Sequence, residues 1–128
     1  MSNLPYPVLS PEEKDTVLQW VRKFKLSSPI KKLSRDLSDG VLVAEIVHQL
    51  FPRLVDLHNY TRGFSIARKL DNWETLNRKV FKKLELGLTT EVIHAIASGQ
   101  PGAVDVVLLE ILMRVDTAAE VRELDMAS

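Results

Sequence analysis

Apolar residues recur along the chain with a helical period, and no segment shows the sustained alternation expected of a strand. The most apolar segment begins at Ser38 and reaches Phe51, where Pro52 ends it. After its first three residues, its polar interruptions are Glu45, His48 and Gln49. A helix that is apolar nearly all round belongs in the centre of a bundle. The pattern therefore predicts an all-α fold built around this helix.

A capping box predicts an earlier helix. Ser10 occupies the N-cap, Pro11 the favoured first helical position and Glu13 the third. We expect this helix to reach about Phe24, because Pro29 and the serines before it then break the chain. One apolar stripe packs it on the core, with two more apolar residues at the margins. The stripe comprises Val17, Val21 and Phe24, and the margins hold Leu18 and Trp20.

Ser65 is expected to begin a third long helix that reaches about Leu84. At 100° per residue, one narrow stripe of this helix comprises Ile66, Leu70, Trp73, Asn77, Val80 and Leu84. We expect Trp73 to lie in the core. Asn77 is the polar member of the stripe, and a buried amide needs hydrogen-bond partners, so we expect it to hold the backbone of a neighbouring loop.

The last third of the chain predicts a short helix from Thr90 to Ser98, closed by Gly99, and then a final helix. The apolar face of the final helix comprises Val104, Val107, Leu108, Ile111, Leu112 and Val115. Beyond Asp116 the pattern thins, so the helix either extends or frays there. The whole pattern predicts a compact bundle of about four main helices plus short connecting helices.

The 128 residues are enough for one domain with its own core. We expect residues 1–10 to be an N-terminal extension, residues 11–116 to be the domain, and residues 117–128 to be a C-terminal extension or the start of a truncated region. No apolar run approaches the roughly 20 residues that span a bilayer, so we expect no membrane partner.

Charge is distributed unevenly along this neutral chain. Residues 1–87 contain 15 Lys and Arg against 10 Asp and Glu, whereas residues 88–128 contain 2 against 7. The first part therefore suits an acidic partner, and an acidic end that serves only solubility is the alternative. One basic group precedes the central helix and comprises Arg22, Lys23, Lys25, Lys31, Lys32 and Arg35. A second group, interpreted as a continuous ridge on the third helix opposite its apolar stripe, comprises Arg68, Arg78, Lys79 and Lys82. Simple solvation is the alternative for both groups.

Residues suited to catalysis or metal binding form no convincing pattern. The chain has no cysteine, and its three histidines lie apart and outside any metal-binding motif. Asp36 and Asp39 lie beside a helix start, where we expect them to act as caps that interact with the helix dipole. We therefore expect no enzymatic activity, no metal and no cofactor.

Five sequence strings, together with Trp20 in the first helix, carry a resemblance to a known family. They are LSRDLSDGVLVAE at residues 33–45, HNY at 58–60, KLDNW at 69–73, LNRKV at 76–80 and PGAV at 101–104. Together they resemble the calponin homology domain of the sperm flagellar protein 1 family. The resemblance implies the all-α calponin homology fold, a cytoskeletal role without enzymatic activity, and a microtubule-binding module in a ciliary, flagellar or cortical microtubule protein.

The resemblance also implies a partner and a location. Tubulin is the expected partner, and its acidic surface would meet the two basic groups if they converge into one patch. The expected location is the cytoplasmic cytoskeleton, at the axoneme of a cilium or flagellum or at microtubules associated with the basal body. We expect this domain to be monomeric, with dimerisation supplied by a C-terminal coiled coil that is missing here.

An actin-binding domain or a protein-interaction scaffold is the alternative function, because the calponin homology fold hosts those roles as well. The single domain argues against strong actin binding, since the actin-binding members usually carry two domains in tandem. A nucleic-acid partner is not expected, because the net charge is zero and no nucleic-acid-binding motif is present.

Overall fold

The computed structural model describes residues 4–127, and within the last helix it describes side chains as far as residue 115. The described residues form an all-α bundle without a strand. The α-helices are α1 (Pro11–Val21), α2 (Leu33–Asp36), α3 (Val41–Leu50), α4 (Ile66–Lys79), α5 (Thr90–Ala97) and α6 (Ala103–Ala127). Two 3₁₀ turns connect them, η1 (Leu57–Asn59) and η2 (Phe81–Leu84). The predicted fold class is confirmed.

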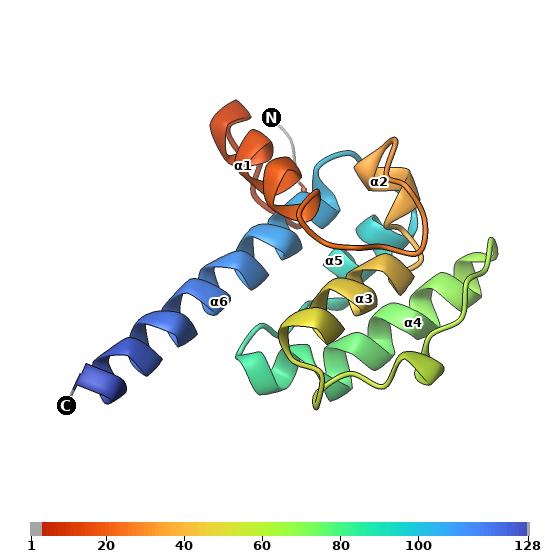
Figure 1. Ribbon diagram of the computed structural model, residues 1–128. Coiled ribbons are helices and arrows are strands. Elements are labelled where there is room, and N and C mark those ends of the chain that lie inside the picture. Colours follow the sequence, from red (N-terminus) through yellow and green to blue (C-terminus); the bar gives the residue numbers. More distant parts are fainter. Residues whose placement is uncertain (1–3, 128) are drawn as a thin grey trace.

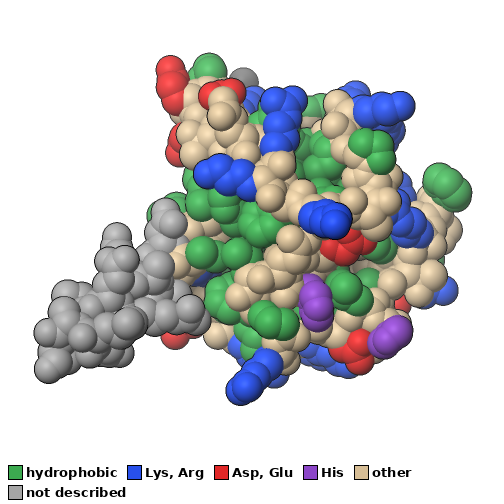
Figure 2. All heavy atoms as spheres, viewed as in Figure 1, with side chains coloured by type: hydrophobic (Ala, Val, Ile, Leu, Met, Phe, Trp, Pro, Cys, Tyr) green, Lys and Arg blue, Asp and Glu red, His purple; other side chains and the backbone are tan. Residues whose placement is uncertain are grey.

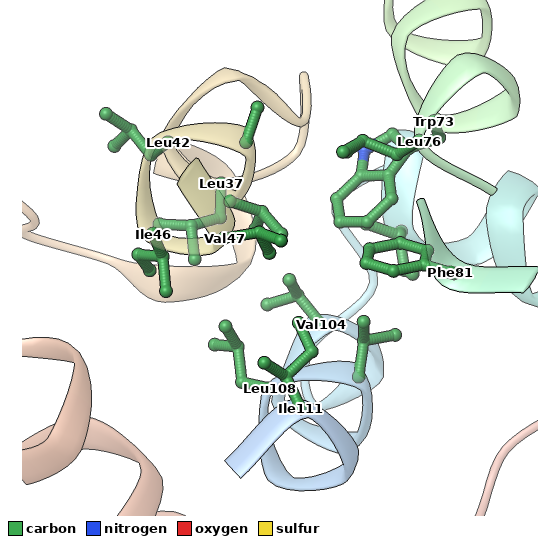
Figure 3. Packing of buried hydrophobic residues seen from close by; sticks show 14 of the residues in the cluster. Leu37, Leu42, Ile46, Val47, Trp73, Leu76, Phe81, Val104, Leu108 and Ile111 are labelled. Carbon is green, nitrogen blue, oxygen red and sulfur yellow. The ribbon is translucent and has the colours of Figure 1, made fainter. Parts of the chain in front are cut away.

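The central position of α3 matches its apolar sequence. Figure 1 shows α3 between α6 and α4, with α1 and α2 near one end of the bundle. Six of its side chains are buried: Val41, Leu42, Val43, Ala44, Ile46 and Val47. In Figure 3, side chains of α3 face those of α4, η2 and α6 across one core, where Trp73 and Phe81 lie with ring centroids 6.3 Å apart. Trp73 is 0% exposed, as predicted.

The capping box at the start of α1 is confirmed, but the predicted end of this helix is wrong. Ser10 Oγ accepts a hydrogen bond from Glu13 N at 3.1 Å, and Glu13 Oε1 accepts one from Ser10 N at 2.9 Å. The helix ends at Val21 with Arg22 as its C-cap, because Arg22 N is the last to donate four residues back, to Leu18 O, whereas Lys23 N and Phe24 N donate to carbonyls three residues back. Phe24 therefore leaves the helix and packs edge-on against Trp20, with ring centroids 5.0 Å apart.

The start of the central helix also differs from the prediction. α3 begins at Val41 rather than at Ser38, and α2 forms a separate turn before it. Gly40 lies between them with φ +81°, and a Cβ there would lie 3.4 Å from atoms of Trp73 and Leu76. Glycine therefore suits both the left-handed conformation and the close packing of α4. Asp39 Oδ1 accepts a hydrogen bond from Val41 N at 3.0 Å, so this carboxylate binds the first N–H of α3, although the N-cap itself is Gly40.

The third predicted helix is broken near its end. α4 ends at Lys79, and η2 follows after a change of backbone direction at Val80. The break turns Phe81 into the core, where it is fully buried. At the other end of α4, Ile66 is 49% exposed, so the predicted apolar stripe does not extend to the first turn.

Arg114 of α6 holds the end of η2. Its guanidinium donates to Leu84 O at 2.9 Å and to Glu85 O at 2.8 Å, and it pairs with Glu110 at 2.6 Å. Glu85 has a φ of +57°, which is unusual for a residue with a side chain. The guanidinium thereby satisfies two carbonyls at this turn and attaches it to α6.

The termini add two observations. Tyr6 and Leu9 belong to the core. The Tyr6 hydroxyl donates a hydrogen bond to Pro101 O at 3.2 Å. The segment predicted as an N-terminal extension thus packs on the turn before α6, while the division into residues 1–10, 11–116 and 117–128 stays a prediction. The backbone of α6 continues as a helix past residue 116, so of the two predicted alternatives the helix extends rather than frays. Its side chains after residue 115 lie outside the described part.

Candidate basic interaction surface

The loop before α2 presents basic side chains around one ordered carboxylate. Asp36 Oδ2 accepts hydrogen bonds from Lys31 N at 2.7 Å and Lys32 N at 2.8 Å, and Oδ1 pairs with Arg35 Nε at 3.1 Å. These bonds, led by that from Lys32 N, hold the pKa of Asp36 below its usual value. The ionised carboxylate thus fixes the backbone of the basic loop, while the three basic side chains remain exposed.

A chain of hydrogen bonds brings the start of α4 to this loop. Lys69 Nζ donates to Ser38 Oγ at 3.0 Å, and that hydroxyl donates to Arg35 O at 2.8 Å. Arg68, the neighbouring predicted site residue, is exposed on the same turn of α4. Sequence reasoning missed Lys69 because it lies between the apolar stripe and the basic face of α4, where it is half-buried.

A second connection joins the loop after α1 to the segment before α4. Ser27 Oγ accepts a hydrogen bond from Arg62 Nη2 at 2.6 Å and donates to Glu45 Oε2 at 2.5 Å. Gln49 Nε2 donates to Lys25 O at 2.8 Å, so α3 holds this loop at two points. Arg62 therefore joins the predicted Lys25 on this side of the molecule, and it too was missed from the sequence.

The ten predicted residues do not form one continuous patch. Arg78 lies ten residues after Arg68, which is about 15 Å along the axis of α4. Lys79 is the last residue of α4, and Lys82 lies on η2 beyond the break. The prediction of a continuous ridge is wrong, because α4 ends before the ridge would be complete. Figure 2 shows Lys and Arg side chains spread at intervals over α1, α2 and the adjoining end of α4.

Arg22 and Lys23 lie at the end of α1, each beside a different hollow. Arg22 lines one that continues along residues 24–30 toward α2. Lys23 lines another between α1 and α6, together with Trp20 and Leu112. Both side chains are exposed, so the first predicted group extends around the end of α1 rather than forming a flat patch.

Two asparagines and a tryptophan on α4 determine which segments meet. Asn72 is 0% exposed, and its Nδ2 donates at 2.8 Å to both Asp39 O and Thr61 O. Trp73 Nε1 donates to Ser38 O at 2.8 Å. One turn further along, Asn77 Nδ2 donates to Leu88 O and its Oδ1 accepts from Leu88 N. The predicted role of Asn77 is confirmed, whereas the equivalent role of Asn72 was missed because it lies beside the apolar stripe.

Comparison with known proteins places this arrangement in a family. The model of a family described as the CH-like domain in sperm protein matches residues 17–113. The chain belongs to this family. It is 45% identical to sperm flagellar protein 1 of Bos taurus and of Homo sapiens over 97 residues, which is 76% of this chain and 41% of each relative. The Mus musculus protein of the same name is 42% identical over 109 residues, 85% of this chain and 47% of the relative.

Membership in the CH-like family confirms the resemblance and supports a cytoskeletal calponin homology domain. The matched range contains all ten predicted site residues, and it begins after Tyr6 and Leu9 of the core. The chain spans less than half the length of the relatives it matches.

The described part of this CH-like domain lacks the features of a metal centre or a membrane span. Among residues whose positions are described, no three His, Asp or Glu side chains gather closely enough to hold a metal ion. Searched over the same residues, no helix has the length and apolarity to cross a bilayer. His48 Nδ1 lies 3.0 Å from Val55 O, so this histidine holds loop backbone.

Proposed function

We propose that this CH-like domain is a microtubule-binding module that contacts the acidic tubulin surface through basic residues around α2 and the start of α4. The observation that carries the proposal is the hydrogen-bonded chain from Lys69 through Ser38 to Arg35, which joins these two elements. The proposed surface consists of Arg22, Lys23, Lys25, Lys31, Lys32, Arg35, Arg62, Arg68 and Lys69. We call it the α2–α4 basic surface.

The physical support comes from order and proximity. Charges within about 10 Å of one another act together at ordinary ionic strength, because screening sets in beyond that length. The loop around Lys31 is held by Asp36, so binding does not have to order it first. Arg78, Lys79 and Lys82 complete the predicted set, but they lie farther along α4 and η2 and contribute less in this proposal.

The family supports the cellular setting of the proposal. The relatives are named sperm flagellar protein 1, which agrees with a place in the flagellar cytoskeleton. We place the domain on axonemal or basal-body microtubules, as a non-enzymatic monomer. Dimerisation of the whole protein, if a coiled coil follows the domain, would add avidity by joining two such surfaces.

Cosedimentation tests the proposal. The protein is mixed with taxane-stabilised microtubules, or with actin filaments in a parallel sample, at 50 mM and 250 mM salt. We expect pelleting with microtubules that falls at the higher salt, because the contacts are electrostatic and exposed. Pelleting with actin instead would establish the alternative actin-binding function. Absence from both pellets would refute the microtubule module and favour the scaffold function.

A further inference from the structure

Phe64 is the most exposed apolar side chain of the described residues. It is 102% exposed, and it lies between η1 and α4. Ile66, two residues later, is 49% exposed. A fully exposed aromatic side chain contributes nothing to the core, and exposed aromatic residues are enriched at binding interfaces.

The loop that carries Phe64 is anchored on both sides. Before it, Thr61 O accepts a hydrogen bond from Asn72 Nδ2 at 2.8 Å. After it, Ser65 Oγ caps α4 by accepting from Arg68 N at 3.2 Å. Gly63 lies against the Arg68 side chain so closely that a Cβ on it would meet the Arg68 Cβ at 2.9 Å. The backbone around Phe64 is therefore fixed while its ring stands free in solvent.

Basic residues flank Phe64 along the chain. Arg62 lies two residues before it and donates to Ser27, and Lys69 lies five residues after it and donates to Ser38. The anchored loop thus continues the α2–α4 basic surface. Figure 1 shows the start of α4 at the edge of the bundle opposite the long α6, and Figure 2 shows hydrophobic atoms protruding from that edge.

We propose that Phe64 is an apolar anchor that enters a depression of the microtubule lattice while the basic residues beside it contact acidic groups at its rim. The inference rests on the proposed microtubule binding and deepens it by naming an uncharged contact. Protein interfaces are enriched in aromatic residues, Phe among them, and are enclosed by a polar rim. One such ring, even with Ile66, buries less apolar surface than a myristoyl chain, which by itself binds membranes only marginally. Because an apolar group beside a basic patch also suits an acidic membrane, the choice of a protein surface rests on the proposed microtubule binding, and vesicle flotation tests it.

Substitution of Phe64 separates this contact from the charged ones. We expect Phe64→Ser to weaken microtubule binding about tenfold, equivalent to about 1.4 kcal/mol, with the same dependence on salt as the wild type. Phe64→Leu keeps an apolar side chain and should bind within about threefold of the wild type. The matched control is Val8→Ser, which removes another exposed apolar side chain on the far segment before α1. This control should bind like the wild type.

A second measurement does not depend on loss of binding. Phe64→Trp places a new fluorophore in the loop before α4. Its emission should shift to the blue on addition of microtubules, because the ring leaves water. The same titration of the wild type, which reports Trp20 and Trp73, corrects for the native signal.

The outcomes are distinguishable. Wild-type pelleting with unchanged binding of Phe64→Ser would overturn the anchor and leave the microtubule module standing. Equal weakening by Val8→Ser would also overturn it, because the effect would not be local to the loop. Absence of wild-type pelleting would refute both proposals. Flotation of the wild type, but not of Phe64→Ser, with phosphatidylserine vesicles would reassign the anchor to a membrane.

Discussion

The first half of α4, defined as residues 66–73, and its second half, residues 74–79, are held by different partners, and the difference decides where basic residues gather. In the first half, Lys69, Asn72 and Trp73 donate hydrogen bonds to residues 38, 39 and 61, which precede α3 or α4. In the second half, Asn77 binds Leu88, which follows η2. Only the first half therefore brings its basic side chains to those of α2. Convergence of charge follows from buried hydrogen bonds rather than from the helix face on which a lysine lies.

The largest expected effect comes from removing the tryptophan of the first half. Trp73→Ala should lower the free energy of unfolding by about 3–5 kcal/mol, because it opens a core cavity and leaves Ser38 O without its donor. Urea denaturation followed by circular dichroism measures the change. Trp73→Phe serves as the control that keeps most of the ring and removes the N–H. A loss below about 1 kcal/mol for the alanine variant would show that the first half of α4 does not depend on this residue.

The two asparagines compare the halves directly. Asn72→Ala should cost about 3 kcal/mol, because two carbonyls lose their buried donor. Asn77→Ala should cost about 1 kcal/mol, since Asn77 is only half-buried and water can replace its bonds to Leu88. The same urea titration measures both variants. Equal costs would mean that the two halves are fastened equally strongly.

Much of this comparison was predictable from the sequence, and the features that the sequence did not predict have physical reasons. Helical period and capping patterns are local, so the capping box at Ser10 and the start of a helix at Ser65 could be predicted. Asn77 interrupts an apolar stripe, which made its role visible. Asn72 and Lys69 do not interrupt the stripe, and their partners lie 11 to 33 residues away. The break after Lys79 was missed because Phe81 reaches the core only in the folded bundle, not through any local breaker residue.

Charge reversal tests whether the two halves of α4 also differ in their contribution to microtubule binding. Lys31→Glu with Lys32→Glu should weaken microtubule binding about tenfold at 50 mM salt, because both positions belong to the α2–α4 basic surface. The matched pair, Lys79→Glu with Lys82→Glu, changes the net charge equally at the other end of α4 and should weaken binding less than about threefold. Cosedimentation gives both affinities, with circular dichroism as the check on folding. Equal weakening by both pairs would indicate that net charge, and not the cluster, determines binding.

The smallest expected effect concerns Asp36. This residue orders the basic loop before α2, which the first half of α4 contacts through Lys69. Its pKa in the folded state lies below the ordinary value of 3.8, chiefly through the bond from Lys32 N. The stabilisation it supplies is therefore complete above pH 3.8 and is lost as the pH falls through the folded pKa. Asp36→Asn should cost about 1 kcal/mol at pH 7 and should lose less stability on acidification than the wild type.

The pKa of Asp105 on α6 shifts in the direction opposite to that of Asp36, so its effect on the pH dependence of stability has the opposite sign. Burial raises the pKa of Asp105, so its ionisation opposes folding, and acidification through its raised pKa relieves that cost. Because Asp105 is present in both proteins, its contribution cancels when the stability of Asp36→Asn is subtracted from that of the wild type. Urea titrations at pH 7, 5, 4 and 3 should give a difference that is constant down to about pH 4 and then shrinks. A difference that stays constant to pH 3 would mean that the carboxylate charge does not order the loop, and the α2–α4 basic surface would then owe its arrangement to the bonds of Ser38 and Ser27.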